Sequence, residues 1–258
     1  MNAASGSRIL TIRPAMLGAF VARATGLDRR RWVASANGQF HINPVSVFGT
    51  AMLRGEYEPG MNCILEAYLR PGDVFVDLGA NEGYFSVKAS TLVGVHGTVV
   101  AVEPQSRLLP VLHDNFARNQ CLNVRLVRCV LSDKTGVLRL SLAAATNNGS
   151  SSLLRGTKYR VPTEEVQSFT LTDFFNRVGL ERCDLMKVDI EGSEYDVLMA
   201  AAQVLRSGII RNIALEFHPS KFEQRGVTTD ELHQHLIECG YRVNTGLGPI
   251  VYSFASIR

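Results

Sequence analysis

The sequence predicts an α/β protein with a doubly wound, mostly parallel sheet that ends in a C-terminal antiparallel hairpin. Two observations favour this fold class. From residue 73 onward, short Val-rich runs alternate with segments of helical periodicity, which is typical of parallel β-α-β units. Residues 241–256 instead form two extended runs around a Gly-Leu-Gly turn at 246–248, the pattern of a hairpin.

The individual elements follow from local signals. Apolar runs of strand length end in polar residues, and helical segments end in glycine or before proline. In chain order, the first half contains helix 61–69, strand 74–79, helix 81–94, strand 98–104, helix 106–119 and strand 123–133. The second half contains strand 184–190, helix 193–208, strand 212–218 and helix 228–240. Residues 136–171 interrupt this rhythm with two extended pieces around the polar loop TNNGSSS at 146–152.

The composition is that of an ordinary globular protein. Of its 258 residues, 46% are hydrophobic and 20% charged, which is sufficient for one large core. No apolar run reaches the roughly 18 residues of a membrane span. No secretory signal is recognised, so we expect a cytoplasmic protein. The five cysteines are odd in number and form no CxxC pair, which favours reduced thiols over disulfides or a zinc site.

Charge is distributed unevenly along the chain. The net charge is +3, but residues 1–54 hold seven arginines against the single acid Asp28. We therefore predict a basic, partly helical extension at 1–56, followed by the main domain at 57–258. The extension could contact an acidic partner or surface. No zinc finger, RNP-like motif or aromatic-interleaved basic stripe is present, so we expect no nucleic-acid partner.

The segment VFVDLGANEGYFS, residues 74–86, predicts a ligand site at a strand–turn–helix junction. Its glycines, Gly79 and Gly83, permit a sharp turn and close approach of a ligand to the backbone, although they could also serve turn geometry alone. Glu103 ends the next strand, where it can accept hydrogen bonds from both hydroxyls of a ribose. Asn81 stands where the dinucleotide motif G-x-G-x-x-G has its second glycine, so a nucleoside without a pyrophosphate fits better.

Several motifs in order resemble the FkbM-type S-adenosylmethionine-dependent methyltransferases of class I. They are VDLGANEGYFS, VVAVEP, VLSDKTG, GSSSL and MKVDIEGSEYDVL, within a similarity that covers roughly residues 55–243. The resemblance implies a Rossmann-like class I methyltransferase fold and S-adenosylmethionine as cofactor. It also implies O-methylation of a hydroxyl on a sugar, glycolipid or secondary metabolite, with a small molecule or glycan as acceptor.

The resemblance also implies a set of cofactor-binding residues. Asp77, Gly79, Asn81 and Gly83 would surround the methionine part, with Ala80, Tyr84 and Phe85 in the same site, Glu103 at the ribose, and Ser132 and Asp133 at the adenine. Asp133 has a second interpretation as a turn residue, because SDKTG is favourable turn chemistry.

Two apolar strands become polar on one face toward their carboxyl ends. Lys187 and Asp189 share one face of the first strand, and Glu216 and His218 share one face of the second. If the strands are neighbours, Lys187 can pair with Asp189 or Glu216, which would explain a lysine within a sheet. The remaining charged groups, including Glu191, would line the cleft.

These residues are candidates for catalysis. An alcohol acceptor must lose a proton, and we expect Asp189 or His218 to act as base, with Glu191 and Glu216 orienting the acceptor. An alternative is a divalent cation such as Mg²⁺ on Asp189, Glu216 and Glu191, although we predict no metal. Glu194 is interpreted as structural, since it lies in the first turn of the next helix.

Two other functions are compatible with such a sheet. One is an NAD(P)-dependent oxidoreductase, which the missing second glycine disfavours, and the other is a non-catalytic module that binds a nucleoside cofactor, which the polar strand ends disfavour. Neither the acceptor nor the oligomeric state follows from the sequence.

Overall fold

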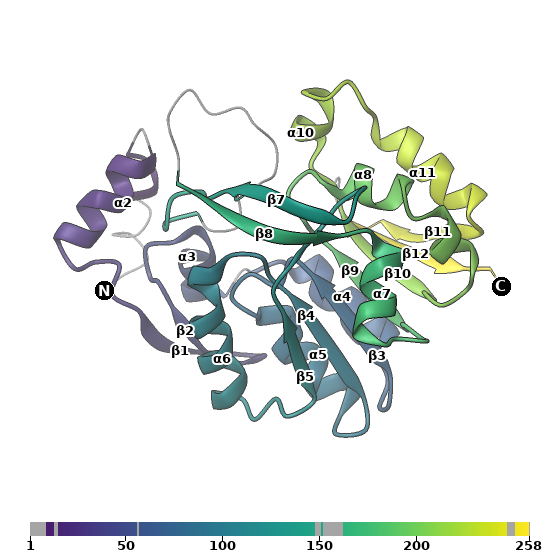
Figure 1. The fold of residues 1–258 in the computed structure, drawn as a ribbon. Coiled ribbons are helices and arrows are strands. Elements are labelled where there is room, and N and C mark those ends of the chain that lie inside the picture. The colour runs from purple at the N-terminus through teal and green to yellow at the C-terminus, as the bar shows by residue number, and fades with distance from the viewer. Residues whose placement is uncertain are drawn as a thin grey trace.

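A seven-stranded, mostly parallel sheet forms the centre of the protein in a computed structural model, which describes residues 9–12, 15–55, 57–147, 151, 162–246 and 251–257 (Figure 1). The strands, in spatial order, are β11 (Tyr241–Gly246), β12 (Val251–Ser256), β10 (Asn212–Glu216), β9 (Leu185–Val188), β3 (Val74–Leu78), β4 (Thr98–Val102) and β5 (Val124–Val127). The five strands from β10 to β5 are mutually parallel, and β12 is antiparallel to both of its neighbours. The predicted fold class is confirmed, including the C-terminal antiparallel pair, whose connection at 247–250 lies outside the described residues.

Helices cover both faces of this sheet, because strand side chains alternate between two apolar layers. Phe75 and Leu185 face a core shared with three helices, whereas Val76 and Met186 face the opposite core. The first layer contains α4 (Pro59–Tyr68), α5 (Tyr84–Val93) and α6 (Leu109–Arg118), with the short turn η1 (Ser106–Leu108) before α6. The second contains α7 (Leu171–Val178), α8 (Glu194–Met199), α9 (Ala202–Arg206) and α11 (Thr229–Glu238), while α10 (Pro219–Glu223) follows β10.

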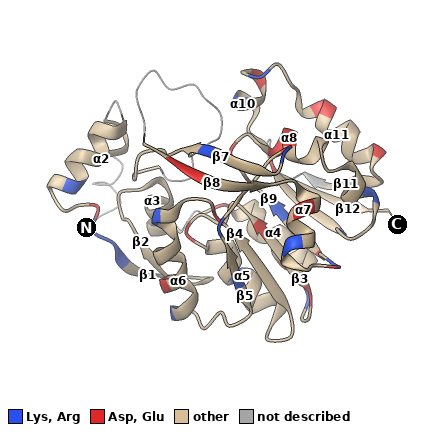
Figure 2. Ribbon diagram, viewed as in Figure 1, with Lys and Arg blue, Asp and Glu red and all other residues tan. Residues whose placement is uncertain are grey.

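The N-terminal segment contains a β-hairpin as well as helices, and it packs on the first layer. Its elements are α2 (Ala15–Ala24), β1 (Arg31–Ser35), β2 (Gly38–Ile42) and α3 (Val47–Arg54). Phe40 of β2 and Phe48 of α3 are buried in the same core as Phe75 of the central sheet. The boundary predicted after residue 56 therefore falls between two helices, α3 and α4, that share one core. Figure 2 shows basic residues on α2 and β1.

A smaller three-stranded sheet corresponds to the interruption predicted from the sequence. It consists of β6 (Val130–Leu131), β7 (Gly136–Ser141) and β8 (Thr163–Phe169), with β8 antiparallel to β7 and parallel to β6. The single strand expected at 123–133 is in fact two strands, because the chain leaves the central sheet after β5 and pairs with β8 instead. The helix expected at 193–208 is likewise divided into α8 and α9. In the part of the chain that is described, no helix combines the length and apolarity needed to traverse a bilayer.

Candidate active site

A cleft opens at the carboxyl ends of the central strands, as expected for an open parallel sheet. Its floor is formed by the residues that follow β3, β4 and β9 and by the end of β10: Gly79, Asn81, Glu82, Glu103, Pro104, Gln105, Asp189, Ile190, Glu191, Glu216 and His218. Its walls include Ser46, Val47, Phe48, Tyr57 and Glu58 from the N-terminal side. Asn147 and Ser151, from the polar loop at 146–152, also line it, while residues 148–150 and 152 of that loop lie outside the described residues.

The turn between β3 and α5 brings two strand ends into close contact. Gly79 has a φ of 86°, and a Cβ atom built there would lie 1.9 Å from the carbonyl oxygen of Asp189. Gly83 also has a φ of 86°, and its Cβ would lie 2.9 Å from side-chain atoms of Leu112 and Phe116 on α6. Both positions therefore require glycine for conformation and for space. The first lets β3 and β9 present their terminal residues to one cleft.

Glu103 is oriented at the end of β4 by two backbone amides. Its side chain is buried, with the residue 3% exposed, and its two carboxylate oxygens accept from the N–H groups of Asn81 and Gln105, each at 2.9 Å. Burial raises the pKa of Glu103 to about 7, although the two amide hydrogen bonds oppose the rise. The side chain of Gln105 also hydrogen bonds this carboxylate, which offers about four acceptor sites in all. The arrangement fits a neighbouring pair of hydroxyl donors, such as those of a ribose.

Asn81 offers a second acceptor at this end of the cleft. The residue is in the left-handed region, with a φ of 50°, and its side-chain oxygen Oδ1 is buried without a hydrogen-bond partner among the described residues. A buried acceptor without a donor is costly, so it is typical of a site that a ligand completes. Beside it, Glu82 is held by Arg30 of the N-terminal segment at 2.7 and 3.1 Å. The extension is thereby joined to the motif turn.

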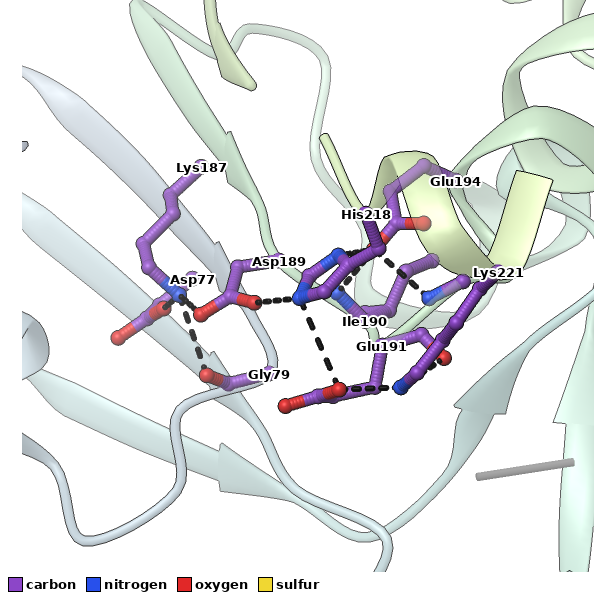
Figure 3. A network of polar contacts seen from close by, with 10 residues as sticks. Asp77, Gly79, Lys187, Asp189, Ile190, Glu191, Glu194, His218 and Lys221 are labelled. Atoms are coloured by element: carbon purple, nitrogen blue, oxygen red, sulfur yellow. Dashed lines mark hydrogen bonds and ion pairs between the residues drawn. The ribbon is translucent and has the colours of Figure 1, made fainter. Parts of the chain in front are cut away.

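Lys187 lies at the centre of a buried charge network beneath the cleft (Figure 3). Its Nζ is 3.1 Å from Asp189 Oδ2 and 3.3 Å from Asp77 Oδ1, and it donates to the carbonyl oxygen of Gly79 at 3.2 Å. Burial by itself lowers the pKa of Lys187. The charges of Asp189 and Asp77 raise it by a larger amount, so the net shift is upward. The pairing of Lys187 with Asp189 agrees with the sequence prediction. Its second partner is Asp77, not Glu216, because β3 is the other neighbour of β9.

Several residues expected in the cofactor site lie outside the cleft lining. They are Asp77, Ala80, Gly83, Tyr84, Phe85, Ser132 and Asp133. Asp77 is 1% exposed, and its carboxylate is engaged by Lys187 and by the hydroxyl of Ser86 at 2.6 Å. Asp77 is thus held in a buried pair with Lys187 at the end of β3.

The other residues of this group have structural surroundings. Tyr84 and Phe85 pack with Tyr57 in an aromatic cluster beside the cleft, and Ala80 is buried at the β3 turn. The hydroxyl of Ser132 donates to Asp133, whose half-exposed carboxylate lies 4.0 Å from Lys134. At that side the lining consists instead of the apolar residues Cys129, Val130, Leu131 and Leu140.

Three carboxylates gather at the opposite end of the cleft from Glu103. Oxygen atoms of Glu58, Asp189 and Glu216 lie within 4.8 Å of one another. Burial, followed by the charge of Asp189, raises the pKa of Glu58 to about 8 and that of Glu216 to about 7. Such a cluster can accept hydrogen bonds, hold a proton near neutral pH or hold a small cation, although Lys187 already supplies one positive charge.

Glu58 is a site residue that sequence reasoning missed. It precedes Pro59 at the start of α4 and has a φ of 41°, which is unusual for a residue other than glycine. Its Oε2 is buried without a hydrogen-bond partner in the described part of the chain. An acid directly before a proline at a helix start was the available signal, but nothing in the sequence connects that position with the ends of β9 and β10.

His218 follows β10 and is surrounded by acids (Figure 3). Its Nδ1 lies 2.9 Å from Glu194 Oε1, and its Nε2 lies 3.6 Å from Glu191 Oε2 and 3.8 Å from Asp189 Oδ1. Burial lowers the pKa of His218, but the hydrogen bond and charge of Glu194, followed by Asp189 and Glu191, raise it to about 9. Glu191 itself pairs with Lys221 of α10. All four expected catalytic residues, Asp189, Glu191, Glu216 and His218, thus line one cleft.

Comparisons with known proteins identify relatives of the chain. The family model described as the Methyltransferase FkbM domain matches residues 77–243. Methyltransferase sdnD of Sordaria araneosa is 28% identical over 184 residues, covering 60% of this chain and 70% of that protein. The 31-O-demethyl-FK506 methyltransferase FkbM of Streptomyces tacrolimicus is 30% identical over 177 residues, covering 58% and 67%.

One solved structure among the similar folds is a methyltransferase FkbM from Methylobacillus flagellatus. It has a TM-score of 0.47 and 16% identity, with 92% of this chain and 58% of that chain covered. The family match begins at Asp77, at the end of β3, and extends into β11. It therefore includes every strand end on the cleft floor, whereas the wall residues 46–58 precede it.

Proposed function

Because the chain belongs to the FkbM methyltransferase family, we propose that it transfers a methyl group from S-adenosylmethionine to a hydroxyl of a sugar, glycolipid or secondary metabolite. The observation that carries this proposal is a single cleft with two chemically different ends. One end offers the oriented carboxylate of Glu103 and the free acceptor of Asn81. The other offers the acids around Asp189 and the imidazole of His218.

The Glu103 end supports a nucleoside cofactor. Bound S-adenosylmethionine supplies a methyl group on a sulfonium, whose electron pair stays on sulfur when the carbon–sulfur bond breaks. Glu103 would accept hydrogen bonds from the ribose hydroxyls, and Asn81 Oδ1 would accept from a donor such as the amino group. The apolar side at Val130 and Leu131 suits an adenine ring.

The His218 end supports deprotonation of an alcohol. A positioned base contributes about 10²–10⁴-fold to such a step. Asp189 Oδ2 is engaged by Lys187 at 3.1 Å, whereas His218 Nε2 has its charged neighbours at 3.6 and 3.8 Å, beyond hydrogen-bond distance. We therefore favour His218 as base, with Asp189 beside it. Transfer to oxygen is further supported by the Streptomyces relative, which is named for 31-O-demethyl-FK506.

Calorimetric titration with S-adenosylmethionine, S-adenosylhomocysteine and NADH tests the cofactor. We expect the two sulfur compounds to bind, and Glu103→Gln to weaken binding about 10–100-fold, as expected for a lost charged hydrogen-bond acceptor. Glu165→Gln, at an exposed acid of β8, is the matched control and should bind as the parent does. Binding of NADH alone would overturn the proposal in favour of an oxidoreductase.

Methyl transfer to a lysate, followed by mass spectrometry, tests the reaction. Acceptors should gain the mass of one CH₂ group only when cofactor and enzyme are both present. His218→Ala and Asp189→Ala should lower turnover while cofactor binding persists. Unchanged turnover in both variants would contradict the assignment of the base.

A further inference from the structure

We infer that Glu194 is a positioning residue for His218, whose imidazole it holds in the tautomer with a proton on Nδ1 and the Nε2 lone pair toward the cleft. The inference rests on the function proposed above, because it assigns the orientation of the proposed base. It also changes the role expected for Glu194, which the sequence indicated only as a helix-start acid.

The tautomer follows from the donors around one oxygen atom. Glu194 is fully buried, and its Oε1 accepts from the backbone N–H groups of Ile190 at 3.0 Å and Gly192 at 3.1 Å (Figure 3). The same oxygen lies 2.9 Å from His218 Nδ1. Because Glu194 Oε1 already accepts hydrogen bonds from two amides, it is the acceptor toward His218 as well. Nδ1 must therefore carry the proton and donate it. A neutral imidazole has one N–H, and its other nitrogen, Nε2, then carries the lone pair.

The backbone around Glu194 is shaped to make this contact. Glu191 and Gly192 both have positive φ angles, 57° and 98°, and this left-handed turn directs the amides of residues 190 and 192 toward Glu194 Oε1. On the opposite side, the carbonyl oxygen of His218 accepts from Lys221 and Phe222 at the start of α10. Glu194 therefore connects the ends of β9 and β10 through one carboxylate oxygen.

The two nitrogens of His218 have different neighbours. Glu194 contacts Nδ1, whereas Asp189 and Glu191 are the acids closest to Nε2, and Lys221 of α10 neutralises part of the charge of Glu191. Glu216, two residues earlier on β10, adds a further carboxyl group nearby. Loss of the Glu194 charge should therefore weaken proton binding by His218 without removing a group from the Nε2 side.

The proton movement is balanced without transfer to Glu194. The acceptor hydroxyl gives its proton to His218 Nε2, and its oxygen forms the new bond to the methyl carbon as the carbon–sulfur bond breaks. The resulting imidazolium has an N–H at both nitrogens, and Nδ1–H remains hydrogen bonded to the Glu194 carboxylate, which stabilises the positive charge. Glu194 thus acts through His218 and touches no substrate atom.

Nitrogen NMR of the wild-type protein tests the tautomer directly. The signals of His218, identified by their loss in His218→Gln, should show protonated Nδ1 and unprotonated Nε2 at a pH above the imidazole midpoint. This measurement requires neither cofactor nor methyl transfer, so it can fail independently of the proposed function. A neutral His218 protonated on Nε2 would overturn the inference without any substitution of Glu194.

Glu194→Gln tests the effect of the charge. The glutamine oxygen can still accept from Ile190, Gly192 and His218, so geometry is kept while the charge is lost. We expect the pKa of His218 to fall from about 9 by one unit or more, a tenfold or larger loss of proton affinity. The acid limb of the kcat/KM profile should move to lower pH by the same amount.

Asp196→Asn is the matched control, because it removes a carboxylate from the same helix. Asp196 pairs with Arg225 and does not contact His218, so the titration of His218 should remain that of the parent. If Glu194→Gln moves the titration no further than Asp196→Asn does, the inference is wrong. A folded Glu194→Gln with a shifted midpoint supports it even if no acceptor has been found.

Discussion

Replacement of Lys187 by methionine should destabilise the protein strongly. The side chain is 1% exposed and pairs with Asp77, which is equally buried, and with Asp189, which is partly exposed. Removing one partner of a buried ion pair costs about 3–5 kcal/mol, because the remaining charge is buried without compensation. Asp189 can regain water, whereas among the described residues Asp77 would retain the Ser86 hydroxyl alone as a partner. We therefore expect a loss of about 3 kcal/mol in the free energy of unfolding.

Urea denaturation of Lys187→Met and the parent measures this loss. In thermal denaturation, the melting temperature should fall by about 6–12 °C, which is the shift expected for that free energy in a chain of this size. Lys134→Met, at a largely exposed lysine, is the control and should change stability by no more than about 0.5 kcal/mol. A double variant with Asp77→Asn should lose less than the sum of the single losses. Equal stability of Lys187→Met and Lys134→Met would refute the reasoning.

Two further predictions concern the cleft. Gly79→Ala should cost well over the roughly 1–2 kcal/mol of a left-handed alanine, because its Cβ would lie 1.9 Å from the Asp189 carbonyl oxygen. Gly208→Ala, with a φ of 79° and open space, should show the conformational cost alone, and equal urea midpoints would contradict the steric argument. Treatment with EDTA should leave turnover within about twofold, because we predict no metal; a loss restored by Mg²⁺ would instead indicate a cation on Glu58, Asp189 and Glu216.

The acidic end of the cleft combines charges that would repel one another in isolation. Lys187 offsets part of this repulsion from below, and Lys221 offsets part of it from α10. The raised pKa values of Glu58 and Glu216 indicate that the cluster binds protons more tightly than isolated carboxyls do. When the pKa of a carboxyl group is higher in the folded than in the unfolded protein, the folded state binds the proton more tightly. The protein then loses stability as the pH rises from the unfolded-state pKa to the folded-state pKa. Stability should therefore decline between about pH 5 and 8 as Glu216 and Glu58 ionise, unless a bound cation compensates.

The sequence alone determined the succession of strands and helices along the chain in the main domain, the polar ends of β9 and β10 and the family to which the chain belongs. These features depend on local patterns of apolar and polar residues and on short motifs, so they can be recognised without coordinates. Glu103 and Asn81 could be singled out for the same reason, since each is tied to a strand end by its position in the chain.

Only the tertiary structure decided which charged groups meet. Asp77 and Lys187 are 110 residues apart in the chain and pair because β3 and β9 are neighbours in register. Glu58 reaches the cleft from an element before the sheet, and Glu194 reaches back from α8 to a histidine on another strand end. Such pairings depend on the spatial order of the strands in the sheet and on left-handed backbone turns at single residues. These properties arise from the packing of the whole chain, which is why local sequence patterns did not predict them.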